Sequence, residues 1–432
     1  MNLSRRLFVL LIPLALLLSA CGTNDDPGTA AGGSSGGSSE GGQAGGEPVA
    51  EGPATGDLTV WAMGAEGEKA STLAEAFMEE NPDVTVDVTP VPWDVAHDKL
   101  LTAVAGQETP DVSQMGTTFM GEFAETGALD EVPAGFDPGA FFDGAWETNV
   151  VDGKTYGVPW YIETRLLYYR TDIAEKAGIT EAPKTWDELK AMAEAMQSEG
   201  GAKYGIALGP SNWQEYMPFV WSNGGEVVDD EGNFALDSPQ ATEALAYYDS
   251  FFEEGLTAQS VPEGFDITPA FVQGTHPMFF SGPWHLGLIK DVGGKDIEGK
   301  WDVAAMPAKE SATSFVGGSN LSVFTNTDNR DAAWKFVEFV SRPEVQVDWY
   351  SEVAALPAVE AAWDDETLTA DDDVTAFGEQ LESAKAQPSI PTWVEVETTI
   401  NSEMEKVTVG NASPEEGAAA MQAAAESIGT GE

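Results

Sequence analysis

The fold is decided by residues 57–88, which read DLTVWAMGAEGEKASTLAEAFMEENPDVTVDV. Residues 57–62 alternate apolar and polar side chains, which is typical of a strand, and residues 84–88 repeat the alternation. Between them, residues 68–80 carry apolar side chains at helical spacing, and Pro82 ends that helix. Strand, helix and strand in this order form a βαβ unit, so the sequence predicts α/β architecture with a parallel sheet covered by helices.

The rest of the chain continues this pattern. Thr185-Trp-Asp-Glu188 is a capping box that predicts a helix start, and Ser238-Pro239 predicts another, with Pro at the first helical position. The chain of 432 residues shows no internal repeat and is too long for one doubly wound sheet. Two α/β lobes are the simplest arrangement for a chain of this length.

Composition excludes several classes of protein. Hydrophobic residues make up 42% and charged residues 22%, which is ordinary for a globular protein. Acidic residues outnumber basic ones by 73 to 20, giving a formal net charge of −53. A field of this sign repels phosphate backbones, so we expect no nucleic-acid partner. The acidic excess is spread along the folded region, which predicts an acidic surface of the halophilic kind; an acidic exported protein without adaptation to salt is the alternative.

Few residues are available for metal or nucleophilic chemistry. The chain has one cysteine and three histidines, His97, His276 and His285. His276 and His285 lie nine residues apart with two prolines between them, which is not the spacing of a helical ligand pair. It contains no phosphate-binding loop, no Gly-x-Ser-x-Gly elbow and no His-Glu-x-x-His motif. We therefore expect no metal site, no cofactor and no catalytic residue.

The N-terminus has the features of an export signal. Arg5 and Arg6 precede an apolar run that is short for a membrane span, and Leu-Ser-Ala-Cys21 follows. This resembles a bacterial lipoprotein signal, which predicts a signal peptide over residues 1–20 and a lipid on Cys21. A transmembrane anchor is the alternative, and the twin-arginine and general export routes both stay open. Residues 21–56, rich in Gly and Ser, are expected to form a flexible tether at the extracellular face of the cytoplasmic membrane.

Large aromatic side chains also occur outside amphipathic patterns, beside Gly, Pro or polar residues. Pyranose rings stack their C–H faces on aromatics and bond their hydroxyls to carboxylates and amides, so such pairs suit a neutral sugar. Packing of a loop against the core is the alternative for each ring. The segments concerned are Pro159-Trp160-Tyr161-Ile162-Glu163, Ser211-Asn212-Trp213-Gln214, Phe280-Ser281-Gly282-Pro283-Trp284 and Pro391-Thr392-Trp393. A small polar cluster, Gly317-Gly318-Ser319-Asn320, could admit a ligand or form a tight turn.

In their order and spacing, several segments together resemble the extracellular solute-binding proteins of carbohydrate ABC importers, the maltose-binding-protein-like group. The resemblance covers nearly all of residues 57–432. The segments are the strand ending at Trp61, Lys99-Leu-Leu-Thr-Ala-Val-Ala-Gly-Gln-Glu-Thr-Pro-Asp111, Asp152-Gly-Lys-Thr-Tyr-Gly-Val-Pro-Trp160, Leu167-Tyr-Tyr-Arg170, Pro183-Lys-Thr-Trp-Asp-Glu188, Met278-Phe-Phe-Ser-Gly-Pro-Trp284, Gly317-Gly-Ser-Asn-Leu321, Ala332-Ala-Trp-Lys-Phe336 and Ala355-Leu-Pro357.

The resemblance implies a two-lobed periplasmic-binding-protein-like fold with hinge crossovers and an interlobe ligand cleft. Its implied N-lobe comprises residues 57–163 and 304–345, and its C-lobe residues 164–303 and 346–432.

The resemblance also implies roles for particular residues. Trp284 resembles the sugar-stacking tryptophan of the second lobe, and Glu163 the hinge glutamate that accepts sugar hydroxyls. The complete set of expected ligand contacts is Glu66, Asp98, Thr117, Thr118, Phe119, Trp160, Tyr161, Glu163, Trp213, Gln214, Trp284, Gly317, Gly318, Ser319, Asn320 and Trp393. Met115-Gly-Thr-Thr-Phe119 and the pair His97 and Asp98 depart from the maltodextrin member, which leaves the identity of the sugar open.

The leading hypothesis is a monomeric, non-enzymatic lipoprotein that captures a mono- or oligosaccharide between its lobes and delivers it to the transmembrane subunits of an ABC permease. One alternative is a binding protein for a cation such as a polyamine or quaternary amine, because aromatic cages with acidic neighbours suit cations. A lipid-anchored glycoside hydrolase is the other alternative.

Overall fold

A computed structural model describes residues 44–262 and 265–431, which belong to one compact unit. The predicted signal peptide, the lipidation site Cys21 and most of the predicted tether lie outside the described residues. Among the helices that are described, none is long and apolar enough to cross a membrane.

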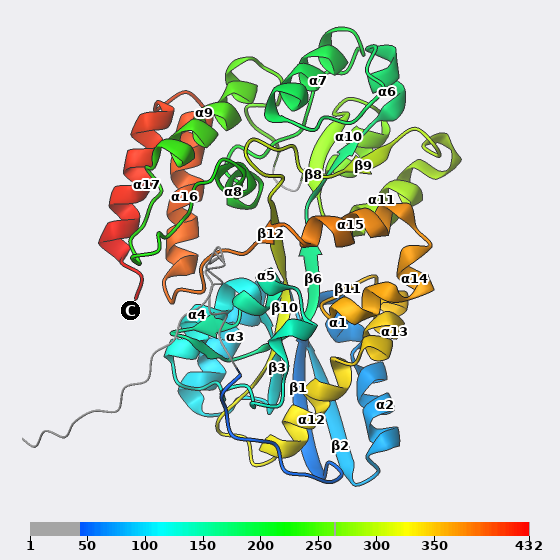
Figure 1. Cartoon of the computed structure of the whole chain (residues 1–432), viewed down its shortest axis with the longest axis vertical. Helices are drawn as coiled ribbons and strands as arrows, with labels where there is room; N and C mark the ends of the chain where they lie inside the picture. The colour runs from blue at the N-terminus through cyan, green and yellow to red at the C-terminus, as the bar shows by residue number, and fades with distance from the viewer. Residues whose placement is uncertain (1–43, 263–264, 432) are drawn as a thin grey trace, which may run out of the picture. The chain divides into compact units, whose positions relative to one another are not determined.

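The large sheet is built around the predicted βαβ unit and lies in the lower half of Figure 1. Its strand order is β11-β6-β10-β3-β1-β2, and β12 pairs with β10. β1 runs parallel to β2 and β3, as predicted, whereas β10 runs antiparallel to both β3 and β6. The strands are β1 (Gly56–Met63), β2 (Val84–Val91), β3 (Val112–Gly116), β6 (Val158–Thr164), β10 (Ser314–Val323), β11 (Leu356–Pro357) and β12 (Ala384–Lys385).

Helices cover this sheet and close its core. The helix predicted over residues 68–80 is divided at Ala70 into α1 (Gly64–Lys69) and α2 (Ser71–Glu80), which corrects that expectation. Gly67 of α1 lies so close to the Ala62 carbonyl that a Cβ would fall 2.2 Å from its oxygen, so α1 begins directly on the end of β1. The others are α3 (Trp93–Gly106), α4 (Met120–Glu125), α5 (Asp143–Glu147), α12 (Arg330–Val340), α13 (Pro343–Val353), α14 (Glu366–Thr369) and α15 (Asp372–Leu381), with the 3-10 helices η1 (Thr117–Phe119), η2 (Pro138–Ala140) and η4 (Glu360–Asp364) and the hairpin β4 (Val150–Val151) and β5 (Lys154–Thr155).

The small sheet has the order β8-β7-β9, and both of its pairings are antiparallel. Its strands are β7 (Leu166–Tyr169), β8 (Met278–Ser281) and β9 (Asp302–Ala304). A second core joins it to α6 (Thr171–Lys176), α7 (Trp186–Ser198), α8 (Trp213–Ser222), α9 (Pro239–Glu253), α16 (Trp393–Thr408) and α17 (Pro414–Ile428), while α10 (Ile267–Val272), α11 (Trp284–Gly293) and η3 (Gly294–Asp296) lie beside β8 and β9.

Two helix starts confirm the N-cap residues that the sequence predicts, but the capping box predicted at Thr185 forms only one of its two bonds. The Thr185 hydroxyl accepts a hydrogen bond from the Glu188 amide at 3.2 Å at the start of α7. The Glu188 carboxylate in turn accepts from the Lys184 amide at 2.7 Å, one residue before the position that a capping box requires. At α9, the Ser238 hydroxyl accepts from the Ala241 amide, and Pro239 occupies the first helical position.

A single residue, Arg165, connects β6 of the large sheet to β7 of the small sheet. Ser314, at the start of β10, holds its backbone: the Ser314 hydroxyl lies 3.2 Å from the Arg165 amide and 2.8 Å from its carbonyl oxygen. The Thr164 hydroxyl donates to the Phe315 carbonyl at 2.7 Å. The junction between the two sheets is therefore anchored on both sides of Arg165.

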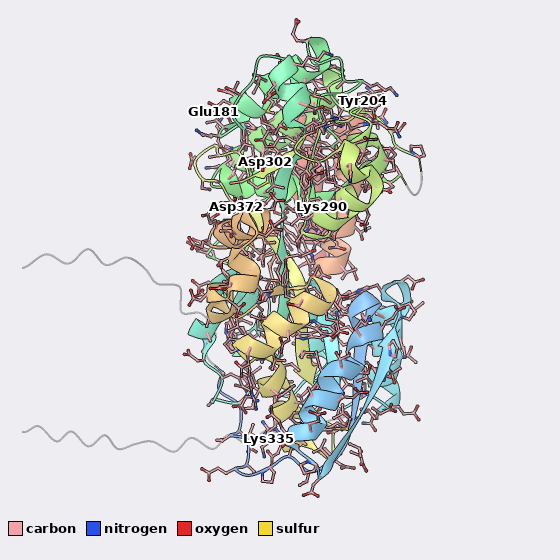
Figure 2. The ribbon with its side chains drawn as sticks, turned by 90° about the vertical axis from the view of Figure 1, so that its right-hand side faces the viewer. Glu181, Tyr204, Lys290, Asp302, Lys335 and Asp372 are labelled. Atoms are coloured by element: carbon pink, nitrogen blue, oxygen red, sulfur yellow. The ribbon has the colours of Figure 1, made fainter. Side chains whose placement is uncertain are left out.

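The acidic excess lies on the outside of the unit. Glu181, Asp302 and Asp372, labelled in Figure 2, are all exposed. Burial of unpaired carboxylates is costly, so most of the 73 acidic residues can be accommodated only at the surface.

Candidate ligand-binding site

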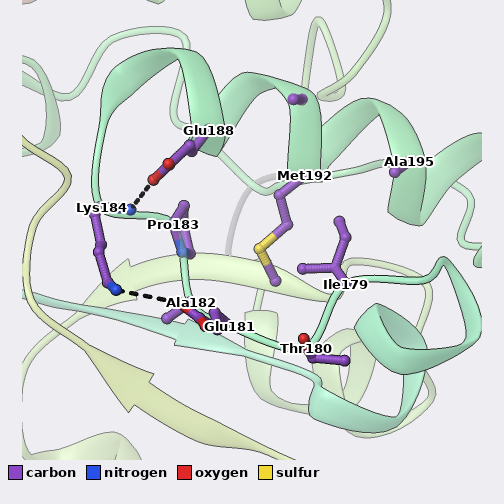
Figure 3. Close-up of a pocket in the computed structure, with 10 residues that line it drawn as sticks. Ile179, Thr180, Glu181, Ala182, Pro183, Lys184, Glu188, Met192 and Ala195 are labelled. Carbon is purple, nitrogen blue, oxygen red and sulfur yellow. Dashed lines mark hydrogen bonds and ion pairs between the residues drawn. The ribbon is translucent and has the colours of Figure 1, made fainter.

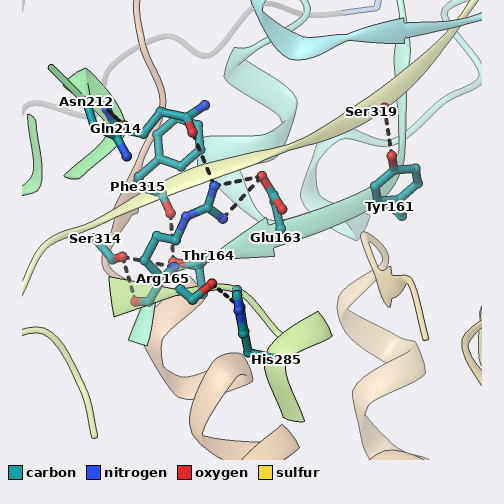
Figure 4. A network of polar contacts seen from close by, with 12 residues as sticks. Tyr161, Glu163, Thr164, Arg165, Asn212, Gln214, His285, Ser314, Phe315 and Ser319 are labelled. Atoms are coloured by element: carbon teal, nitrogen blue, oxygen red, sulfur yellow. Dashed lines mark hydrogen bonds and ion pairs between the residues drawn. The ribbon is translucent and has the colours of Figure 1, made fainter. Parts of the chain in front are cut away.

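A polar cluster lies at the junction of the two sheets. Glu163 and Arg165 are two residues apart in sequence, and Arg165 Nη2 donates to Glu163 Oε1 at 3.2 Å (Figure 4). The same nitrogen donates to Gln214 Oε1 at 3.3 Å, from the first turn of α8. The Arg165 guanidinium also lies 4.8 Å from the centre of the Trp284 ring and 5.4 Å from that of Phe315. Arg165 thus connects β6 with α8, α11 and β10.

The Tyr161 hydroxyl forms the second part of the cluster. It accepts hydrogen bonds from Ser319 Oγ at 3.2 Å and from Gln114 Nε2 at 3.3 Å. Gln114 Nε2 also donates to Ser319 Oγ at 3.0 Å, and its Oε1 accepts from the Met63 amide at 2.6 Å. Burial, and next the negative charge of Glu66, raise the pKa of Tyr161 well above its usual value, so the hydroxyl stays protonated. It therefore keeps a proton that it can donate to a solute.

Two carboxylates face this part of the cluster. Glu66 lies in the first turn of α1, directly after β1. Burial raises the pKa of Glu66, its own backbone amide lowers it, and the charge of Glu163 raises it further. The charges of Glu66 and Glu163 both act on Tyr161, so α1 and β6 bring these three side chains near one another.

Trp284 offers an aromatic surface. It begins α11 and is 41% exposed, although it is a large apolar side chain. Its ring lies over Gly282, where a Cβ would fall 2.1 Å from a ring carbon, so only glycine permits this position. The ring has the exposure that stacking on a solute requires.

The predicted ligand contacts Thr117, Thr118 and Phe119 form η1, and a second exposed ring, that of Trp93, lies beside them. Phe119 packs against His97, at 4.9 Å between ring centres, and against Trp93, at 6.4 Å. Thr117 is buried and Thr118 half-buried. Asp98 is exposed, and its nearest ion-pair partner is His97 at 3.7 Å. Asp98 is therefore not brought into the polar cluster.

The three other predicted tryptophans are buried. Trp160 is 3% exposed and stacks on Trp349 at 5.4 Å between ring centres. Trp213 and Trp393 are 5% and 1% exposed and pack edge to face on each other. Their predicted contact with a ligand finds no support in this geometry, because each ring fills a core. Trp160 lies in β6, and Trp213 and Trp393 each begin a helix, so all three pack into a core from regular elements and not from loops.

The predicted glycine and polar cluster, residues 317–320, belongs to β10 and forms no tight turn. Gly318 has a φ of +125°, and a Cβ there would fall 2.2 Å from the Tyr161 carbonyl oxygen. A Cβ on Gly317 would lie 2.9 Å from Glu163 Oε1. The two glycines thus let β10 pass close behind Tyr161 and Glu163. Asn320 is buried and bonds to Thr148, away from Tyr161.

Sequence reasoning missed four residues of this region: Gln114, Arg165, Trp93 and Glu397. Trp93 is 39% exposed, begins α3 after Pro92, and lies beside Gly64 and Phe119. Burial raises the pKa of Glu397 to about 7, while the indole groups of Trp393 and Trp213 lower it. An aromatic at a helix start after a strand could have identified Trp93. Nothing in the sequence marks the other three.

Several features lie away from the cluster. The cavity of Figure 3, of about 550 Å³, is lined by residues 179–184 and by α7, and it contains no predicted site residue. His285 is held by Ser281, with Oγ and Nδ1 2.6 Å apart, and burial lowers its pKa to about 4. Among the described residues, no group of His, Cys, Asp or Glu could hold a metal ion.

Comparisons with known proteins agree with this architecture. The family model for bacterial extracellular solute-binding proteins matches residues 63–347. A binding protein of Brucella abortus is 31% identical over 353 residues, which cover 79% of this chain and 85% of that protein. A maltotriose-binding protein of Pyrococcus abyssi is 29% identical over 352 residues, covering 78% and 74%.

The solved structures include the sugar-binding protein MalE from Xanthomonas citri. It superposes with a TM-score of 0.81 at 32% identity and covers 86% of this chain and 97% of that one. The chain therefore has the mixed α/β fold of periplasmic binding proteins, and it is a solute-binding protein, not an enzyme. It belongs to the family of bacterial extracellular solute-binding proteins.

Proposed function

We propose that this protein captures a neutral mono- or oligosaccharide outside the cell and delivers it to the transmembrane subunits of an ABC permease. The observation that carries the proposal is the cluster of Tyr161, Glu163, Arg165 and Gln214 beside the exposed Trp284 ring. It combines one stacking surface with hydroxyl, carboxylate, guanidinium and amide groups, which is the set of contacts that a pyranose needs. Similarity to a maltotriose-binding protein and to a sugar-binding protein supports the same class of solute.

The proposed mechanism is closure of two lobes around the sugar. We assign the large sheet to the first lobe and the small sheet to the second, with Arg165 as one connection between them. β11 pairs with β6 of the large sheet. We therefore propose that the chain makes its final crossing to the second lobe after Pro357, and not at residue 346. A solute favours closure only through contacts that both lobes make at once. Glu66 and Tyr161 on one side and Trp284 on the other are the proposed pair of surfaces.

We further propose that the protein acts as a monomer, anchored by a lipid on Cys21 at the extracellular face of the cytoplasmic membrane. The apolar run before Cys21 and the Gly- and Ser-rich stretch after it support this anchoring. Treatment of the producing cells with an inhibitor of lipoprotein signal peptidase should then leave an uncleaved precursor. A Cys21→Ala variant should lose the lipid and should also remain as the uncleaved precursor, because the peptidase cleaves before the lipidated cysteine.

The test of sugar binding is thermal unfolding of the full chain in a panel of neutral sugars. A ligand at 100 times its dissociation constant adds about 2.7 kcal/mol of stability, which raises the melting temperature measurably. Stabilisation by one class of sugar would support the proposal. The absence of any shift across monosaccharides and oligosaccharides would contradict it.

One observation favours a cation as a second candidate. Glu66 and Glu163 bring two carboxylates near Tyr161, in a protein with a net charge of −53. A polyamine would be attracted by this field, and its affinity would fall steeply as salt screens the charges. Sugar affinity would change little with salt. A titration at low and high ionic strength therefore separates the two candidates.

A further inference from the structure

The Arg165 guanidinium holds a hydrogen-bond donor that the protein leaves unused. The residue is 9% exposed, and within the described part of the chain its Nη1 has no hydrogen-bond acceptor. Glu163 Oε1 lies 3.2 Å from this nitrogen, but the geometry is that of an ion pair and not of a hydrogen bond. Buried donors without acceptors are rare in folded proteins because each one costs free energy. A structural role for Arg165 does not explain why this donor is left free.

The position of the guanidinium indicates what its partner is. The group lies over the Trp284 ring, whose exposure makes it accessible to a solute. Because the guanidinium lies 4.8 Å from the centre of this ring, a solute that contacts the exposed part of the ring also lies close to the guanidinium. The other nitrogen, Nη2, is already held by Glu163 and Gln214, so the side chain is kept in place before the solute arrives.

The charges around Arg165 decide whether a charged or an uncharged oxygen of the solute binds there. Glu163 neutralises the guanidinium, and Glu66 adds a second negative charge that acts on Glu163 and Tyr161. A carboxylate on the solute would meet this negative charge and gain little from a guanidinium that is already paired. An uncharged hydroxyl or ring oxygen meets no such repulsion.

We propose that Arg165 Nη1 is a donor reserved for an oxygen of the bound solute, and that the Glu163–Arg165 pair makes the site select neutral sugars over uronates. The proposal rests on the proposed function, because it assumes that the solute stacks on Trp284. Arg165 is then a specificity-determining residue and not only a link between the sheets.

One experiment tests the donor without knowledge of the sugar. In Glu163→Gln, the guanidinium loses its carboxylate and becomes a site for a small anion. We expect sodium acetate to raise the melting temperature of the full-length Glu163→Gln protein above that in sodium chloride of equal ionic strength. Wild type and the double variant Glu163→Gln/Arg165→Gln report the general difference between the two salts, and the difference in Glu163→Gln should exceed it. A difference in melting temperature between acetate and chloride that is the same in all three proteins would overturn the proposal.

The second experiment measures affinity for whichever neutral sugar stabilises the wild-type chain. Arg165→Gln should weaken its binding about tenfold to a hundredfold, as expected for the loss of a charged donor. Arg342→Gln is the matched control, because Arg342 also pairs with a carboxylate, Glu80 at 2.9 Å, and lies 4.9 Å from a ring, Phe339, outside the site. It should bind as wild type does. Unchanged affinity in Arg165→Gln would reject the proposed donor while sugar binding stands, whereas a wild type that binds no sugar would reject the proposed function itself.

Discussion

At the scale of single residues, exposure separates the tryptophans that can bind a solute from those that support the fold. Trp284 is 41% exposed, and its truncation removes a stacking surface. We expect Trp284→Ala to weaken sugar binding by about 1–3 kcal/mol, up to about a hundredfold, with little loss of stability. Titration calorimetry gives the affinity, and urea unfolding gives the stability.

Trp160→Ala is the matched comparison, because Trp160 is also a tryptophan that the sequence predicts as a ligand contact, but its ring is buried against Trp349. We expect it to lower the free energy of unfolding by about 3–5 kcal/mol, which is typical of an emptied aromatic site. If Trp284→Ala destabilised the protein as strongly while binding sugar normally, the assignment of Trp284 as the stacking ring would be wrong.

Glu397 predicts a dependence of stability on pH. Burial raises its pKa from 4.5 to about 7 in the folded protein, so between these values the folded state binds more protons than the unfolded state. Its contribution to stability is therefore greatest below about pH 4.5 and is lost as the pH rises through 7, by up to about 3 kcal/mol. Glu397→Gln should remove this part of the pH profile.

Glu395 is the control for that measurement, because it is exposed on the same helix. The difference in unfolding free energy between wild type and Glu397→Gln should change between pH 5 and 8, whereas the difference for Glu395→Gln should stay constant. Parallel profiles for all three proteins would show that Glu397 has no raised pKa.

At the scale of elements, the close pairing of β6 with β10 positions the site. Gly318 has a φ of +125°, and a Cβ there would fall 2.2 Å from the Tyr161 carbonyl oxygen. Gly318→Ala must therefore strain the backbone and also push the two strands apart. We expect it to lower the free energy of unfolding by more than about 3 kcal/mol and to weaken sugar binding, because Tyr161 and Glu163 lie on the displaced strand.

Gly52→Ala isolates the backbone part of this effect. Gly52 has a similar φ of +107° and has no described atom within 4 Å of its Cβ position. Gly52→Ala should lower the free energy of unfolding by about 1–2 kcal/mol and leave the affinity for sugar unchanged. An equal effect of the two substitutions on unfolding would mean that the contact between β6 and β10 is not tight.

The sequence allowed the large sheet to be predicted better than the small one. The parallel pairing of β1 and β2 and the starts of α7 and α9 follow from local patterns, namely alternation and caps. The three short strands of the small sheet pair over long distances in the chain, and no local pattern encodes such pairing. The break at Ala70 was missed because helical periodicity continues across it, whereas the approach of Gly67 to Ala62 depends on tertiary packing.

The candidate site was predictable only in part, for a related reason. An aromatic beside Pro or Gly has the same local sequence whether its ring faces solvent, as Trp284 does, or fills a core, as Trp160 does. Arg165 was missed because its partners, Gln214 and Trp284, are distant in the sequence. Contacts of this kind arise when the two sheets are brought together, and a single sequence does not display them.

At the scale of the whole molecule, the net charge of −53 predicts a dependence of stability on salt. Acidic side chains such as Glu181, Asp302 and Asp372 are exposed, and their mutual repulsion opposes the folded state more than the expanded unfolded chain. Salt shortens the range of this repulsion from about 30 Å at 0.01 M to about 3 Å at 1 M. We therefore expect the melting temperature to rise steeply with sodium chloride over the lower part of this range.

The lipid and the tether are not needed for this effect, because the acidic residues lie throughout the described part of the chain. Sodium chloride also strengthens hydrophobic burial at high concentration, so the control is the steepness of the response at low concentration, where only charge screening acts. Sucrose, which stabilises folded proteins without screening charge, should raise the melting temperature equally at low and high salt. A melting temperature that does not change between 0.01 M and 0.2 M sodium chloride would show that the carboxylates are already neutralised, by protons or bound cations, and that the acidic surface does not destabilise the fold.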